Sequence, residues 1–177
     1  FAQGAPQEDD ITIVLVKREG GRVMAQRDFL RSFGSLAEIF AFTADFFARH
    51  GVDAGLLPTV DFTLEELFTN MVKYSPSGGA HVRIDMATAP GGVEVTLTDY
   101  DVERFDVTQA PDANINLPLE QRRPGGLGLH LIRRLVDSMT YEYSTEERRS
   151  RITFRKTTAG GKGPGGIAET GGGNACD

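Results

Sequence analysis

The stretch PTVDFTLEELFTNMVKY, residues 58–74, decides the fold, because its apolar residues recur at helical spacing. At about 100° per residue, the apolar side chains gather on one side of a helix: Leu64, Leu67, Phe68, Met71 and Val72. The polar side chains of Glu66, Asn70 and Lys73 fall within about 60° of one another on the opposite side. The stretch therefore predicts an amphipathic helix that buries one face.

The polar side of this helix has two interpretations. In most helices such a side is a solvated face. Asn70 is unusual in mid-helix, because asparagine favours caps and turns. Its side-chain oxygen suits a hard cation such as Mg²⁺, and Glu66 could orient or deprotonate an attacking hydroxyl group.

The segments around residues 58–74 predict an antiparallel sheet and two more helices. Ser35 and Glu38 have the spacing of a capping box that opens a helix, and Gly51 is suited to end it. The run that follows Pro124-Gly125-Gly126 predicts a helix over residues 127–136. Strand patterns occur at residues 11–16, 23–29, 81–87, 93–98, 139–144 and 151–155.

This order of elements groups helices with hairpins, which is typical of an α+β chain and not of a doubly wound parallel sheet. We therefore expect a two-layer α/β sandwich with a mixed, largely antiparallel sheet. Residues 100–124 lack periodicity and are long for a connection, so they predict a functional loop or lid.

Two further features could carry chemistry. Asp99 ends an alternating strand, where its carboxylate could accept a hydrogen bond from an exocyclic amine such as that of adenine, or could form a turn. The glycines of Gly125-Gly126-Leu127-Gly128-Leu129 open a helix, where backbone N–H groups can hold phosphate oxygens; a tight turn is the alternative. No Lys-Ser/Thr pair follows them, which excludes a Walker loop, and Leu131 leaves the dinucleotide motif incomplete.

In this order, the features resemble the GHKL ATPase superfamily over roughly residues 22–156. The stretch ELFTNMVKY at residues 66–74 resembles its N box, Asp99 takes the place of the Asp that opens its G1 box, and GLGL at residues 126–129 resembles its G2 box. The resemblance implies the Bergerat ATP-binding fold, with ATP and Mg²⁺ as ligands.

The resemblance also assigns roles to residues. Glu66 would be the catalytic base, Asn70 the Mg²⁺ ligand, and Lys73 would lie near phosphate. Asp99 would read the adenine amine. The glycine loop would hold the phosphates through its backbone: Gly125, Gly126, Leu127, Gly128 and Leu129. Arg122 and Arg123 could add positive charge there or could be solvent-exposed.

The G1 box departs from the superfamily pattern at one position. The family usually has Asp-x-Gly, whereas this chain has Asp99-Tyr100-Asp101. Asp tolerates a positive φ better than most residues, so nucleotide binding can survive this substitution, and the same departure motivates a noncatalytic alternative.

The short chain and the form GGLGLHLIRRLVD at residues 125–137 resemble the anti-sigma factor serine kinases. That resemblance implies a STAS-domain anti-anti-sigma substrate, a sigma-factor partner and a possible homodimer. Histidine kinases fit less well, because none of the three histidines lies in a dimerising helical pair. The alternatives are a noncatalytic ATP-binding module, or part of a phosphatase–kinase fusion whose main activity is the phosphatase.

The domain organisation follows from the ends of the chain. QEDDITIVLV at residues 7–16 resembles the closing strand of PPM-type serine phosphatases, sporulation stage II proteins included. We therefore expect a phosphatase stub at 1–18, a linker at 19–25, the kinase domain at 26–156 and a disordered glycine-rich tail at 157–177.

Composition restricts the partners and the location. The 177 residues carry a formal net charge of −6, which disfavours nonspecific nucleic-acid binding. The longest apolar run, Ile11–Val16, is far shorter than a membrane span of about 20 residues. The single Cys176 excludes a disulfide framework, so we expect a cytoplasmic protein with neither a membrane nor a nucleic-acid partner.

Overall fold

The computed structural model describes residues 15–19, 21–74, 78–104 and 127–158. Within them, six strands form one sheet in the order β1-β2-β3-β4-β6-β5. The strands are β1 (Leu15–Glu19), β2 (Arg22–Leu30), β3 (His81–Ala89), β4 (Gly92–Asp99), β5 (Ser138–Ser144) and β6 (Arg149–Thr157). The helices are α1 (Leu36–His50), α2 (Leu57–Tyr74) and α3 (Leu127–Leu135), with 3₁₀ turns at Phe33–Ser35 and Ala54–Leu56.

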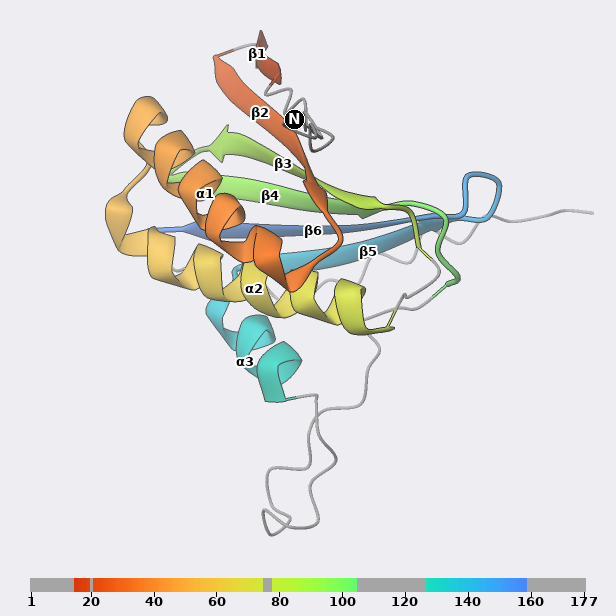
Figure 1. The fold of residues 1–177 in the computed structure, drawn as a ribbon. Helices are drawn as coiled ribbons and strands as arrows, with labels where there is room; N and C mark the ends of the chain where they lie inside the picture. The colour runs from red at the N-terminus through yellow and green to blue at the C-terminus, as the bar shows by residue number, and fades with distance from the viewer. Residues whose placement is uncertain (1–14, 20, 75–77, 105–126, 159–177) are drawn as a thin grey trace, which may run out of the picture.

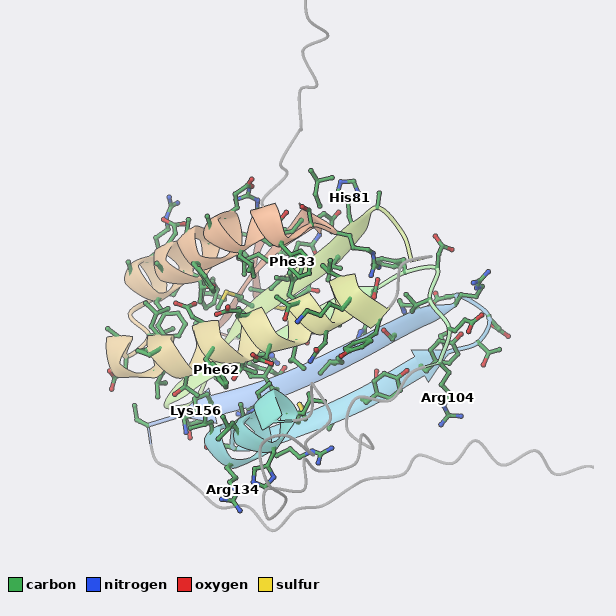
Figure 2. All side chains as sticks on the ribbon, turned by 60° about the horizontal axis from the view of Figure 1, so that its bottom comes forward. Phe33, Phe62, His81, Arg104, Arg134 and Lys156 are labelled. Carbon is green, nitrogen blue, oxygen red and sulfur yellow. The ribbon has the colours of Figure 1, made fainter. Side chains whose placement is uncertain are left out.

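The helices form one layer and the sheet the other, as Figure 1 shows. Figure 2, which looks onto the helical layer, shows α1 and α2 side by side, with α3 on the far side of α2. The predicted α+β sandwich is confirmed. Every pairing between the described strands is antiparallel, so the parallel contribution expected of a mixed sheet is not found in this part of the chain.

The core lies between the two layers and follows from the sequence periodicities. Alternate residues of the central strands point toward the helices and are fully buried: Val82, Ile84, Met86, Val93, Val95, Leu97, Ile152 and Phe154. The apolar side of α2 covers them with Val60, Leu64, Leu67 and Phe68, each 0% exposed. Burying such a side chain stabilises the fold by about 1.5–3 kcal/mol, so this layer fixes α2 across the sheet.

The start of α1 differs from the prediction, whereas its end confirms it. The expected capping box is wrong, because the Ser35 side chain makes no cap bond and its hydroxyl donates to the Leu30 carbonyl at 2.8 Å. Glu38 pairs with Arg27 of β2. Gly51 does end the helix, in the left-handed conformation with φ 63°.

The two ends of the described chain belong to the sheet. Part of the strand expected at 11–16 is seen in β1, whose residues Leu15–Glu19 pair with β2; residues 11–14 lie outside the description. The range 19–25, expected to be a linker, holds the end of β1 and the start of β2. Thr157 still belongs to β6, and residues 159–177 are not described. In the described part, none of the helices combines the length and the apolar character that crossing a membrane requires.

Candidate functional site

The polar side of α2 faces away from the core, as its spacing predicts. Glu66 and Asn70 are half-buried and Lys73 is exposed, one helical turn after another. The intervening Leu67, Phe68 and Met71 are buried. Helix α2 therefore presents a carboxylate and a carboxamide from a rigid element whose other face is fixed by packing.

Gly128, in the first turn of α3, lies directly against Glu66. A Cβ atom at residue 128 would overlap the Glu66 carboxylate, and it would lie 3.1 Å from the Glu66 Cγ atom. The described glycines with a positive φ are Gly21, Gly51 and Gly91, so a left-handed turn does not explain Gly128. The absence of a side chain makes room for Glu66, and the structure thus brings together two of the predicted site residues.

The rest of the glycine loop is described in part. Leu129 is 7% exposed and belongs to the core, so its side chain packs and does not face a ligand. Leu127 begins α3. Gly125 and Gly126, together with Arg122 and Arg123, lie outside the described residues. A phosphate-holding role for the backbone of residues 125–129 stays a prediction.

Asp99 ends β4, as predicted, but it is not open to solvent. Its exposed fraction is 1%, and Arg31, which follows β2, donates to both of its carboxylate oxygens. The bond from Nη1 of Arg31 to Oδ2 of Asp99 is 3.1 Å long. This is a bidentate, charge-assisted pair, the strongest class of side-chain hydrogen bond.

Arg31 occupies a socket that three parts of the chain build. Its Nε donates to the Gly79 carbonyl at 2.8 Å, and its Nη1 also donates to the Met71 carbonyl at 3.0 Å. A Cβ atom at Gly78 would meet the guanidinium, 2.6 Å from its Cζ. Because Met71 belongs to the last turn of α2, one guanidinium joins the end of that helix to Asp99. Figure 1 shows that α2 and β4 end at the same side of the fold.

Burial and ion pairing act in opposite directions on Asp99. Burial raises the pKa of Asp99 above its ordinary value, and the hydrogen bonds and charge of Arg31 oppose that rise. A neutral donor that approached the Asp99 carboxylate would contribute about 1.5–3 kcal/mol, whereas breaking a buried ion pair costs about 3–5 kcal/mol. A ligand that bound Asp99 would therefore do so beside Arg31 and not in its place.

In the turn after β4, Asp101 adopts the conformation that the glycine of the family pattern would adopt. Its φ is 56°, the left-handed region that glycine adopts freely. The Gly79 N–H donates to the Tyr100 carbonyl at 2.7 Å, which fixes the turn against the start of β3. Aspartate at this position therefore keeps the backbone that the glycine of a G1 box makes.

Arg31 is a site residue that the sequence does not predict. The sequence offers no signal for it, because its acceptors at Met71, Gly79 and Asp99 are 40 to 68 residues away along the chain. The register of the sheet brings them together.

The residues of this site fit a magnesium nucleotide. Among the described residues, no group of three or more His, Cys, Asp or Glu side chains could hold a metal ion. Mg²⁺ is commonly bound by one or two protein oxygens together with the phosphates of a substrate. The half-buried oxygens of Glu66 and Asn70 are hard donors of that kind.

Comparison with known proteins agrees with the geometry. The family profile described as "Histidine kinase-like ATPase domain" matches residues 31–156. The match includes α1, α2, α3 and strands β3 to β6 almost completely. A search of curated proteins finds no match to the chain.

Proposed function

The chain belongs to the histidine kinase-like ATPase domains of the GHKL superfamily, and on that premise we propose that it is an ATP–Mg²⁺-dependent serine/threonine protein kinase. It would act as an anti-sigma factor that phosphorylates a STAS-domain partner and also binds a sigma factor, as a homodimer in the cytoplasm. The observation that carries the proposal is the position of the Glu66 carboxylate against Gly128, at the start of the helix that the glycine loop opens.

Each site residue has a defined part in this proposal. Asp99 reads the base, and the backbone around Gly128 holds phosphates at the positive end of α3. Asn70 and the nucleotide phosphates would hold Mg²⁺, which when bound neutralises phosphate charge. Glu66 accepts the hydroxyl proton of the substrate serine as the serine Oγ forms a bond to the γ-phosphorus. The bond between the γ-phosphorus and the β-phosphate oxygen breaks, which releases ADP.

Transfer of labelled γ-phosphate from Mg-ATP to the STAS-domain proteins of the same genome tests the proposal. We expect phosphoserine with the unmodified chain and a loss of about a hundredfold or more with Glu66→Gln, because the general base is lost. Glu65→Gln is the matched control, since Glu65 is the adjacent, exposed carboxylate of the same helix. Equal activity of the Glu66→Gln and Glu65→Gln proteins would refute the assignment of the base.

A noncatalytic nucleotide-binding module is the second candidate. The near-complete burial of Asp99 favours it, because a covered base site suits a domain that binds nucleotide slowly or weakly. Titration calorimetry with Mg-ATP, followed by the transfer assay, separates the two functions. Binding without transfer to any STAS partner would establish the module.

A further inference from the structure

The socket around Arg31 points to a residue that determines base specificity. Arg31 is held by four hydrogen bonds: to Gly79, to Met71 and to each oxygen of Asp99. Its side chain is 8% exposed, so it is buried together with its partner. A group with this many partners is held in place.

The pair leaves hydrogen-bonding capacity on Asp99. An ionised carboxylate has about four lone-pair sites and accepts hydrogen bonds only. Arg31 uses one on each oxygen, and the backbone N–H of Tyr100 also donates to this carboxylate. The remaining capacity can accept from an amino group on a base, and it repels a base that presents a carbonyl oxygen there.

We propose that Arg31 sets the base specificity of this site by holding Asp99 as a pure hydrogen-bond acceptor, so that Asp99 selects a purine with a 6-amino group over one with a 6-carbonyl. The inference rests on the proposed nucleotide-binding function. Without Arg31, the carboxyl would be buried with no cation beside it, and burial alone would raise its pKa. Once protonated, it would donate as well as accept, and the selection would fail.

Among the described residues, Arg31 is the charged group that acts on the Asp99 carboxylate, so the role belongs to Arg31. The neighbouring strands place Val82 of β3 and Ser150 of β6 beside it, and neither residue titrates. Helix α2 contributes the Met71 carbonyl, which accepts a hydrogen bond from Arg31 and does not titrate. Arg31 supplies the opposite charge that lowers the pKa of Asp99 against the effect of burial.

Equilibrium binding of Mg-ATP and Mg-ITP, measured at pH 6 and pH 8, tests the proposal. ITP has a carbonyl where ATP has the amino group. The unmodified chain is expected to prefer ATP by about tenfold or more at both pH values, the effect of one hydrogen bond. Arg31→Met is expected to weaken this preference, at pH 6 at least as much as at pH 8, and Arg31→Lys is expected to retain it.

Asp99→Asn tests the same reasoning if the Arg31→Met protein does not fold. The guanidinium has donors only, so the residue-99 amide keeps a bond to Arg31 only through its oxygen, and its NH₂ group brings a donor to a group that otherwise only accepts. This variant is therefore expected to lose the preference for ATP over ITP. Arg83→Met is the matched control for both variants, because Arg83 makes a bidentate pair with Asp28 at a more exposed position.

The outcomes separate the inference from the function on which it rests. Tighter ATP binding by Arg31→Met would mean that Arg31 competes with the base, and an unchanged preference at pH 6 would mean that it has no influence; either result overturns the inference alone. Equal binding of ATP and ITP by the unmodified chain also overturns it. If the unmodified chain binds neither ATP nor inorganic triphosphate, the proposed function fails and the inference with it.

Discussion

Replacing Gly128 by alanine is expected to separate activity from stability. A Cβ atom at this position would overlap the carboxylate end of Glu66, and its distance from the Glu66 Cδ atom would be 2.5 Å. The atoms in conflict belong to the far end of a flexible side chain and not to the backbone. Glu66 can therefore rotate away, while helices α2 and α3 keep their positions.

The magnitudes for Gly128→Ala nearly cancel in the free energy of unfolding. Alanine is favoured over glycine in a helix by up to about 1 kcal/mol, and less in a first turn. Moving Glu66 off its rotamer costs about 0.5–1.5 kcal/mol. The net change is within about 1 kcal/mol, which corresponds to a shift of about 2–4 °C in melting temperature for a chain of this size.

The activity of the Gly128→Ala protein should fall much further than its stability. A displaced general base forfeits a contribution of about 10²–10⁴ in rate. Thermal unfolding followed by circular dichroism gives the first quantity, and phosphate transfer to the STAS partner gives the second. Gly34→Ala is the control, because its Cβ would have an ordinary contact of 3.6 Å with the Ser32 hydroxyl. A Gly128→Ala protein with full activity would refute the steric argument, and one that unfolds would show that the backbone gives way instead.

Two further substitutions test the sheet and the helix interface. Gly92→Ala should lower the free energy of unfolding by about 1–3 kcal/mol, measured by urea denaturation. The reason is that its Cβ would lie 2.7 Å from the Thr157 Cα and overlap the Lys156 carbonyl, and both of these atoms belong to the backbone. An unchanged midpoint of urea denaturation would contradict this close approach. Burial raises the pKa of Asp61, although a hydrogen bond with Thr43 opposes the rise. The folded state therefore binds this proton more tightly than the unfolded state, and ionisation of Asp61 destabilises the fold. Asp61→Asn should therefore stabilise the protein at pH 7, with an advantage that shrinks as the pH falls toward the ordinary carboxyl range near 4, and a constant difference from pH 7 to pH 3 would contradict the assignment.

The sequence predicts those parts of the fold that depend on neighbours along the chain. The alternation at residues 81–87 and 93–98 predicts the hairpin β3–β4, and the 3.6-residue period of 58–74 predicts α2, because burial of one face acts on every residue of such an element. The left-handed turn at Asp101 is equally local, since it depends on the tolerance of one residue type for positive φ. The predicted capping box is wrong because the Ser35 hydroxyl donates to the Leu30 carbonyl instead. This acceptor lies outside the pattern Ser-x-x-Glu on which the prediction was based.

The site was predictable in its components but not in its contacts. Glu66, Asn70 and Asp99 stand out by residue type and position. The need for a glycine at residue 128 does not stand out in the sequence, because the Glu66 carboxylate that occupies the space of a side chain there is more than sixty residues earlier in the chain. Arg31 was hidden for the same reason. Ion pairs and steric clearances of this kind depend on the sheet register, which no local pattern encodes.

Two charged groups of this site, Glu66 and Arg31, each lie against a glycine, and both are tied to helix α2. Glu66 projects from α2 onto Gly128, and the Met71 carbonyl of α2 holds Arg31, which lies against Gly78 and pairs with Asp99. Residues 66 and 71 of a helix are separated by about 7.5 Å along its axis. A ligand that contacts Asp99 at one end and approaches Glu66 at the other must therefore be elongated and polar at both ends, as a nucleoside triphosphate is. Since packing fixes α2, a substitution that moves this helix should weaken base selection and phosphate transfer together, whereas Arg31→Met should affect base selection and Gly128→Ala should affect phosphate transfer.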